Sequence, residues 1–453
     1  MTSNSSEPGK GTATGGRTAT RPLPPPTARS VVLEILLQRE EPGDFLEHRL
    51  DRIPGMLSLS EGDRRLAREI AFGVLRNRSA LDHMISSRTD GRPQRPVLRG
   101  ILQMGVYQLL FLDRVPDHAV VNEAVVLARL RGFSAQSGFV NAVLRGITRE
   151  KDVCRHALHA LRTQDAALGW SHPNWLVQRW VGVLSEGDLQ RLLAWNNAAP
   201  PTIARVNRLR TTAQALMARW QVEGVEATPV QVDWADPDTI FSLTRHPALE
   251  SLGSFREGGF YIQDPSTLMA VQLLDPQPGE RVLDLCSAPG GKALAIAERM
   301  QNTGCIVAHD SHAGRLELVR ENAERLGANG IELQPNPELG GPEVRFDRVL
   351  VDAPCSNTGV LRRRIELRWR IQPEEITRLA AEQAKLLHRA AERVRPGGVL
   401  VYSTCSLEPE ENEHVVDAFL RDHPEWTQVV RRTLHPVQTP VDGAFAAKLL
   451  RAA

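Results

Sequence analysis

The chain is 453 residues long, enough for about three domains of ordinary size, and its 55 basic and 54 acidic residues give a net charge of +1. This balance excludes a global basic field that would by itself indicate a nucleic-acid partner, and since nearly all basic residues are arginine, a single arginine says little about phosphate recognition. There is no signal peptide and no apolar run of membrane length, and the five cysteines lack metal-ligand spacing, so we expect a cytoplasmic protein with reduced thiols and no metal site.

The first 27 residues differ sharply in composition from the segment that follows them. Residues 1–27 are rich in Ser, Thr, Gly and Pro, so they cannot bury enough surface to offset the entropy of ordering, and we predict a disordered tail. Residues 28–150 show apolar side chains at helical spacing, with a capping-box pattern at Ser58–Glu61 and the most apolar helix at Leu98–Leu110. We predict an all-α bundle with this last helix at its centre.

Residues 151–255 are less regular. Four of the eight tryptophans lie between Trp170 and Trp195, where they could stack on RNA bases or fill a core, and the core is the commoner use of such side chains. A strand is expected at Thr202–Asn207 and a helix at Thr212–Val222. We predict a small α+β middle domain that links its neighbours or binds RNA.

From residue 256 to residue 453 strands alternate with helices, which is typical of an α/β Rossmann-like domain. An apolar strand ends at Asp284, and a loop with Gly290 and Gly291 then opens a helix, so the backbone can approach a ligand and offer N–H groups to an anion. The loop lacks the dinucleotide pattern, which favours a smaller ligand with a carboxylate and a ribose. Asp310 ends the second strand, where an acidic residue receives ribose hydroxyls.

Two cysteines and a carboxylate are expected at one rim of this domain. The fourth strand, Phe346–Asp352, leads to Cys355, and a striped helix ending near Pro396 precedes the fifth strand, which leads to Cys405. These strands are expected to be adjacent with their carboxyl ends at the ligand side. Carbon methylation of a pyrimidine needs such groups: a thiolate adding at C6 activates C5, and a carboxylate orients the ring. The residues alone leave open which cysteine attacks.

Several stretches resemble known families. Residues 104–125 and 138–145 resemble the RNA-binding factor NusB, and residues 284–292, 352–356 and 404–412 resemble the signatures of RNA cytosine-5 methyltransferases. Together they resemble the RsmB (Sun) family, which methylates cytosine in small-subunit (16S) ribosomal RNA. The resemblance implies a NusB-like RNA-binding bundle over residues 28–150 and S-adenosyl-L-methionine as the methyl donor.

The resemblance also implies roles for individual residues. Cys405 would be the nucleophile, Cys355 would assist release of the product, and Asp352 would contact the base. The residues expected to hold the cofactor are Cys286, Ser287, Ala288, Pro289, Gly290, Gly291, Lys292, Asp310, Asn336 and Asp352.

Three positions depart from the family pattern. Asn336 stands where an acidic residue usually contacts the adenine, Ala293 stands where Thr is frequent, and Arg363–Ile365 replaces a usual Arg-His-Pro. An RNA-binding assembly factor with a degenerate cofactor pocket is therefore an alternative, favoured by the Asn336 region. A nitrogen methyltransferase is a second alternative, which the Cys355/Cys405 pair argues against because nitrogen methylation needs no covalent cysteine.

Overall fold

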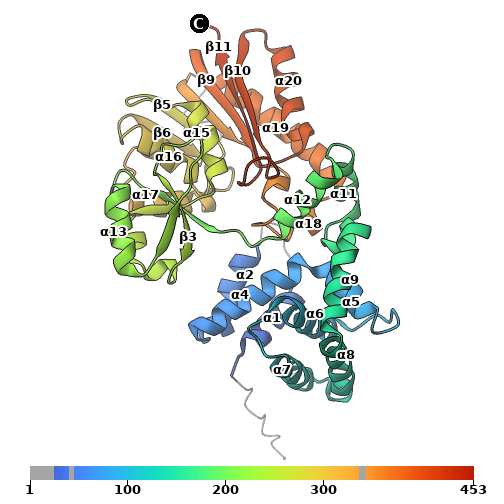
Figure 1. Cartoon of the computed structure of the whole chain (residues 1–453). Coiled ribbons are helices and arrows are strands. Elements are labelled where there is room, and N and C mark those ends of the chain that lie inside the picture. The colour runs from blue at the N-terminus through green and yellow to red at the C-terminus, as the bar shows by residue number, and fades with distance from the viewer. Residues whose placement is uncertain (1–24, 40–44, 336–342) are drawn as a thin grey trace, which may run out of the picture. The chain divides into compact units, whose positions relative to one another are not determined.

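The computed structural model describes residues 25–39, 45–335 and 343–453 (Figure 1). The chain forms two compact units, Met1–Ala71 and Phe72–Ala453. Within the described residues, no helix combines the length and the apolar character that crossing a membrane requires.

The first unit is helical. It contains α1 (Ala28–Leu37), α2 (Leu46–Arg52), α3 (Pro54–Leu57) and the first turns of α4 (Glu61–Arg76). Leu33, Ile35 and Leu46 are among its fully buried side chains. The expected cap at Ser58 is wrong by two residues: Ser60 caps α4 instead, because its hydroxyl accepts a hydrogen bond from the Asp63 N–H at 3.1 Å.

The helical pattern continues into the second unit. Its first helices are α5 (Arg78–Ser86), α6 (Pro96–Phe111), α7 (Asp117–Leu130), α8 (Ser137–Arg149) and α9 (Lys151–Gln164). Every residue of α6 from Gly100 to Leu110 is buried, which confirms the expectation that this apolar helix is central. Three shorter helices follow, α10 (Ala166–Gly169), α11 (Asn174–Val181) and α12 (Glu186–Asn197).

The tryptophans of this region fill a core. Trp180 is 3% exposed, and Trp170 and Trp175 pack against the same hydrophobic cluster. Of the two uses considered for them, packing therefore accounts for these three side chains.

A small antiparallel sheet follows, with strand order β2-β3-β1-β4. Its strands are β1 (Thr202–Val206), β2 (Glu226–Pro229), β3 (Ile240–Arg245) and β4 (Phe260–Ile262). Trp220 of α13 (Ala213–Glu223) packs edge-on against Phe241 and Phe260, with ring centroids 5.5 and 5.3 Å away. The strand expected from Thr202 and the helix expected from Thr212 are confirmed. The helix α14 (Gly253–Arg256) ends one residue after the expected boundary at residue 255, and β4 lies wholly after it.

The C-terminal sheet has seven strands in the order β10-β11-β9-β8-β5-β6-β7. They are β5 (Arg281–Asp284), β6 (Cys305–His309), β7 (Ile331–Gln334), β8 (Phe346–Asp352), β9 (Val394–Thr404), β10 (Trp426–Leu434) and β11 (Ala444–Arg451). Strands β5 to β9 are parallel, whereas β11 runs antiparallel to β9 and β10 antiparallel to β11. The expected adjacency of β8 and β9 is confirmed, but β9 begins at Val394, so Pro396 lies in the strand.

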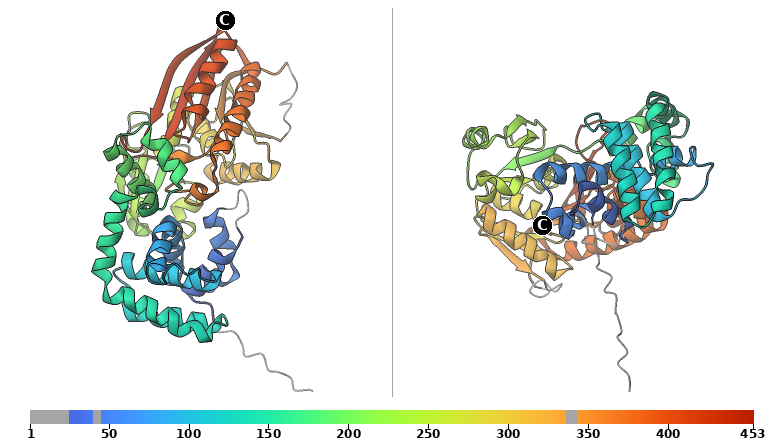
Figure 2. Two further views of the ribbon diagram at one scale, coloured as in Figure 1. Left: turned by 90° about the vertical axis from the view of Figure 1, so that its right-hand side faces the viewer. Right: turned by 90° about the horizontal axis from the view of Figure 1, so that it is seen from below.

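Helices cover both faces of this sheet (Figures 1 and 2). Alternate residues of β9 divide between two cores: Val399 and Val401 face the first, and Leu400 and Tyr402 face the second. The first core includes α15 (Leu268–Leu274) and α16 (Gly291–Arg299), and α17 (Ala313–Leu326) lies on the same face. The second includes α19 (Pro373–Arg393) and α20 (Glu413–Asp422). The described part of the chain also contains the short α18 (Leu367–Arg370) and the 3₁₀ turns η1 (Ser134–Gln136), η2 (Leu249–Ser251), η3 (Pro265–Thr267), η4 (Thr358–Val360) and η5 (Pro409–Glu411).

The small sheet is packed firmly onto the large one. Ile203 and Trp234 belong to the same buried cluster as α15 and α16, and the Trp234 indole donates a hydrogen bond to the Pro265 carbonyl at 2.7 Å. Arg205 of β1 forms a buried ion pair with Glu298 of α16. The middle domain therefore stabilises α16, the helix that starts at the glycine loop.

Candidate active site

The site is built at the carboxyl ends of the parallel strands. Asp284 is the last residue of β5, Asp310 follows β6, Asp352 is the last residue of β8 and Cys405 follows β9. The parallel pairing of these strands brings side chains from distant parts of the sequence to one rim, as the sequence predicts.

The loop between β5 and α16 depends on its two glycines. Gly290 has φ +103°, a left-handed conformation, and a Cβ there would lie 3.2 Å from Val319. A Cβ on Gly291 would lie 3.1 Å from the Tyr261 ring. The Ser287 N–H donates to the His309 carbonyl at 2.8 Å, which ties the loop to the end of β6. The close approach of backbone to its neighbours explains why this corner needs glycine.

Asp310 is buried beside the same loop. Its carboxylate accepts a hydrogen bond from the Ala288 N–H at 3.3 Å and one from the His312 N–H at 3.0 Å, and Arg315 lies 3.3 Å away. Arg315 also donates to the Ala288 carbonyl at 2.8 Å. Asp310 therefore helps to hold the glycine loop in place.

Asp284 is a site residue to which the sequence analysis gave no role. It is fully buried, and neither of its carboxylate oxygens has a hydrogen-bond partner among the described residues. Burial, and then the charge of Asp352, raise its pKa to about 7. The Ser287 hydroxyl of the same loop is also buried and forms no hydrogen bond of ordinary geometry among the described residues, but it lies close enough to Asp284 to oppose the rise of that pKa in part. An acidic residue closing an apolar strand just before the glycine loop was the signal that could have identified it.

Lys292 points to Asp352. Its ammonium lies 2.6 Å from one Asp352 oxygen, and the Ser403 hydroxyl donates to the other oxygen at 2.9 Å. Burial lowers the pKa of Lys292, but the charge of Asp352 and its hydrogen bond more than offset this, so the pKa is raised. The lysine is held as a cation between the glycine loop and the end of β8.

The two cysteines lie side by side. Their sulfur atoms are 3.3 Å apart, and the Cys405 sulfur is also 3.1 Å from the Asn357 side-chain oxygen. Cys355 is buried, whereas Cys405 is partly exposed. The hydrogen bond with Cys405, together with burial, raises the pKa of Cys355 well above its ordinary value, which favours the protonated thiol.

Other predicted residues lie around this centre or outside the described part. Burial and the charge of Asp284 raise the pKa of Cys286, which favours its protonated thiol. Arg363, from the departing Arg363–Ile365 stretch, forms ion pairs with Asp264 at 2.8 Å and Asp442 at 2.5 Å. Asn336 lies outside the residues that the structure describes.

Known proteins match this chain over most of its length. It is 33% identical to the probable ribosomal RNA small subunit methyltransferase B of Bacillus subtilis, covering 88% of this chain and 89% of the relative. It is 36% identical to the ribosomal RNA small subunit methyltransferase B of Salmonella paratyphi B, covering 93% and 98%. The chain belongs to the RsmB family of methyltransferases. The family described as "16S rRNA methyltransferase RsmB/F" matches residues 271–450.

The remaining matches agree with the domain folds. The NusB family matches residues 26–149, and the ferredoxin-like domain of RsmF/B-like methyltransferases matches residues 172–235. Among solved structures, PH0851 is 26% identical with a TM-score of 0.75, covering 95% of this chain and 99% of that one. A methyltransferase homolog protein from Pyrococcus horikoshii is 32% identical with a TM-score of 0.56, covering 64% and 98%. The NusB-like, small α+β and Rossmann-like methyltransferase folds predicted from the sequence are thus confirmed.

Proposed function

We propose that this chain transfers a methyl group from S-adenosyl-L-methionine to C5 of a cytosine in small-subunit (16S) ribosomal RNA, in the cytoplasm. The observation that carries the proposal is the pair of thiols 3.3 Å apart, Cys355 and Cys405, next to the Asp352 carboxylate. Attack at C6 and removal of the proton from C5 need two groups of this kind within reach of one base. The names of the relatives supply the RNA class, and the NusB-like bundle is the part we expect to bind it.

The described residues fit the cofactor. The unpartnered Asp284 carboxylate and Ser287 hydroxyl offer polar groups that a ligand with an ammonium group and hydroxyls can satisfy. The loop from Cys286 to Lys292 gives the backbone approach, and Asp310 stands where ribose hydroxyls are received. When bound there, S-adenosylmethionine supplies an electrophilic methyl group.

Each catalytic residue then has a separate task. The Cys405 thiolate adds to C6 of the cytosine, which makes C5 nucleophilic enough to take the methyl group. Asp352, oriented by Lys292 and Ser403, contacts the edge of the base and holds the ring. After transfer, the Cys355 thiolate accepts the C5 proton, and the electrons of that C–H bond expel the Cys405 thiolate from C6.

Accessibility supports this division between the cysteines. The partly exposed Cys405 can reach a base, while Cys355 is buried and its raised pKa makes its thiolate the stronger base, which suits proton removal rather than attack.

Alanine substitution of each cysteine tests the proposal. Cys405→Ala should abolish methyl transfer, because no thiolate remains to activate C5, while RNA and cofactor still bind. Cys355→Ala should transfer the methyl group and then stall at elimination. That variant should remain attached to its RNA as a species that survives denaturing electrophoresis and disappears on nuclease treatment.

The double variant is the control, since the trapped bond requires Cys405. If Cys405→Ala gave the trapped species and Cys355→Ala did not, the two roles are reversed. Full activity in both single variants would exclude covalent cytosine-5 chemistry and favour nitrogen methylation. RNA binding by the native chain with no methyl transfer at any cofactor concentration would instead point to an assembly factor.

A further inference from the structure

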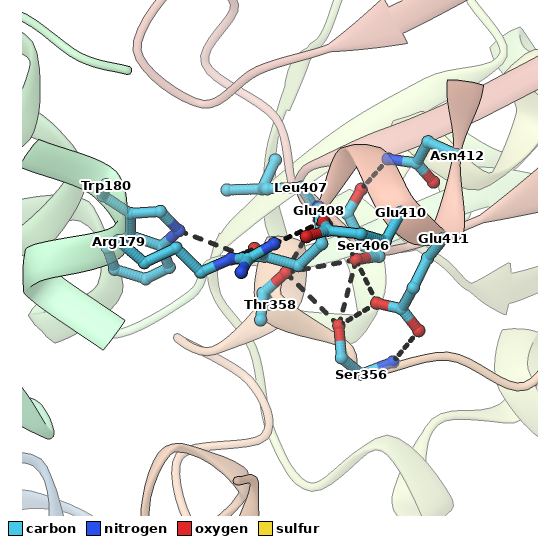
Figure 3. Close-up of polar contacts among 10 residues, drawn as sticks. All are labelled: Arg179, Trp180, Ser356, Thr358, Ser406, Leu407, Glu408, Glu410, Glu411 and Asn412. Atoms are coloured by element: carbon cyan, nitrogen blue, oxygen red, sulfur yellow. Dashed lines mark hydrogen bonds and ion pairs between the residues drawn. The ribbon is translucent and has the colours of Figure 1, made fainter. Parts of the chain in front are cut away.

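A fully buried carboxylate, Glu411, accepts hydrogen bonds from Ser356 and Ser406, the residues that follow the two cysteines (Figure 3). Glu411 ends η5, the turn that follows Cys405 in the chain, and its side chain has 0% exposure. It forms no ion pair with a lysine or arginine among the residues described here. A buried charge without a cation must be stabilised by hydrogen bonds, and it costs stability compared with an apolar residue of the same size.

Both oxygens of Glu411 accept hydrogen bonds from the residues that follow the cysteines. One oxygen accepts from the Ser356 N–H at 2.9 Å and from the Gln383 amide at 2.9 Å. The other accepts from the Ser356 hydroxyl and, at 2.5 Å, from the Ser406 hydroxyl. Ser356 follows Cys355 in the chain and Ser406 follows Cys405, so the carboxylate joins the two cysteine loops, whose serine hydroxyls also lie 2.9 Å from each other.

The loop that carries Glu411 is itself fixed on both sides. Asn412 accepts a hydrogen bond from the Thr404 hydroxyl at 2.5 Å and donates one to the Ser406 carbonyl at 2.9 Å. It thus links the residues on either side of Cys405. At the start of the loop, Arg179 and Trp180 of α11 bind Glu408, the indole at 3.2 Å (Figure 3). The Glu411 carboxylate therefore has little freedom to move with either cysteine loop alone.

We propose that Glu411 is a positioning residue that sets the separation of the Cys355 and Cys405 thiols by binding Ser356 and Ser406 at the same time. It forms no hydrogen bond with either sulfur and holds the two loops through the serines, while its charge contributes to the raised pKa of Cys355. Its consequence for methyl transfer rests on the covalent function proposed above, because only that chemistry needs both sulfurs at one base. Its consequence for the thiol geometry does not depend on that function.

The thiol geometry can be measured without RNA. In a glutathione buffer, two protein thiols and one glutathione disulfide exchange to one protein disulfide and two glutathione thiols. The equilibrium constant reports the effective concentration of one thiol at the other. Mass spectrometry of the peptide that links residues 355 and 405 measures it in the full-length protein, separately from the other three cysteines.

Three variants separate the contributions. Glu411→Ala removes all four hydrogen bonds and should lower the effective concentration by about tenfold or more, because small displacements of reacting groups have large effects. Glu411→Gln keeps the reach and most of the hydrogen bonds and should lower it by less than about threefold. Glu410→Gln is the matched control on the preceding residue, which points to Arg179 at the surface, and it should change the value by less than about twofold.

Single-turnover methyl transfer gives the second measurement. Glu411→Ala should slow transfer by about tenfold or more, with the dissociation constants for RNA and cofactor unchanged within about twofold. If Glu411→Ala fails to fold, the double variant Ser356→Ala, Ser406→Ala removes the hydroxyl links and should produce the same two effects.

An unchanged thiol–disulfide equilibrium in Glu411→Ala, or in the serine double variant, would overturn the proposal even if methyl transfer were lost. A lowered equilibrium supports it. If that equilibrium falls as expected while Cys355→Ala yields no RNA adduct, the positioning role stands and the covalent function fails.

Discussion

Replacing Asp284 with Asn should change how the stability of the methyltransferase domain depends on pH. Asp284 is fully buried without a hydrogen-bond partner among the described residues, and burial raises its pKa from 3.8 to about 7. In the unfolded chain the carboxyl ionises near pH 4. Between these two values the unfolded state loses its proton and the folded state keeps it, so stability falls as pH rises from about 4 to about 7 and the full cost remains above that range.

The size of the effect follows from the two pKa values. Each pKa unit corresponds to about 1.4 kcal/mol, so the cost of Asp284 grows from about 1.7 kcal/mol at pH 5 to about 4.3 kcal/mol at pH 8. The amide that replaces the carboxyl group does not titrate and carries no such slope. The free energy of unfolding of Asp284→Asn, relative to the native sequence, should therefore rise by about 2.6 kcal/mol between pH 5 and pH 8.

Urea unfolding of both full-length proteins at several pH values, without cofactor, measures this difference. The unpaired amide of the variant has its own burial cost of about 1–3 kcal/mol, but that cost is the same at every pH and cancels from the slope. Glu321→Gln, at an exposed position on α17, is the control and should give parallel profiles. Parallel profiles for Asp284→Asn as well would refute the reasoning, because they would mean that the carboxylate is solvated or paired in the folded protein.

Two further changes test other parts of the site and its support. Asp310→Ala should weaken cofactor binding by about 1.5–3 kcal/mol, the value of a hydrogen bond to a charged group, and calorimetric titration giving an unchanged dissociation constant would exclude the ribose assignment. Arg368→Met should destabilise the chain by about 3–5 kcal/mol, because the fully buried guanidinium donates to Ser171, Asn196 and Asn197 and its loss leaves these acceptors unpaired. Thermal unfolding of that variant within about 1 °C of the native chain would contradict this estimate.

The parts of the fold that repeat a simple pattern could be predicted from the sequence. The apolar strands ending at Asp284 and Asp352 indicated the parallel sheet and its ligand-side rim, because parallel strands have a single carboxyl edge. Boundaries were harder to predict. Proline is disfavoured in strands, so a strand start before Pro396 was not expected. β9 nevertheless begins at Val394, because Val394 pairs with Phe346 of the neighbouring strand.

The contacts that complete the site could not be predicted in the same way. Lys292 was expected to bind the cofactor because it belongs to the glycine loop. Its ammonium instead forms an ion pair with Asp352, 60 residues further along the chain. Glu411 was visible only as one of several acidic residues after Cys405. Its link to Ser356 joins two strand ends through hydrogen bonds whose partners no local pattern specifies.

Asp284 and Glu411 show two different uses of a buried carboxylate in one domain. Burial raises the pKa of both, and an apolar residue at either position would avoid the cost of ionisation. Glu411 receives four hydrogen bonds from residues of the chain, so its binding capacity is already used and it can only hold other groups in place. Asp284 receives none from the described residues, which is why we propose that it binds a ligand. The hydrogen-bond partners, rather than the pKa shifts that the two residues share, therefore distinguish the positioning role that we propose for Glu411 from the binding role that we propose for Asp284.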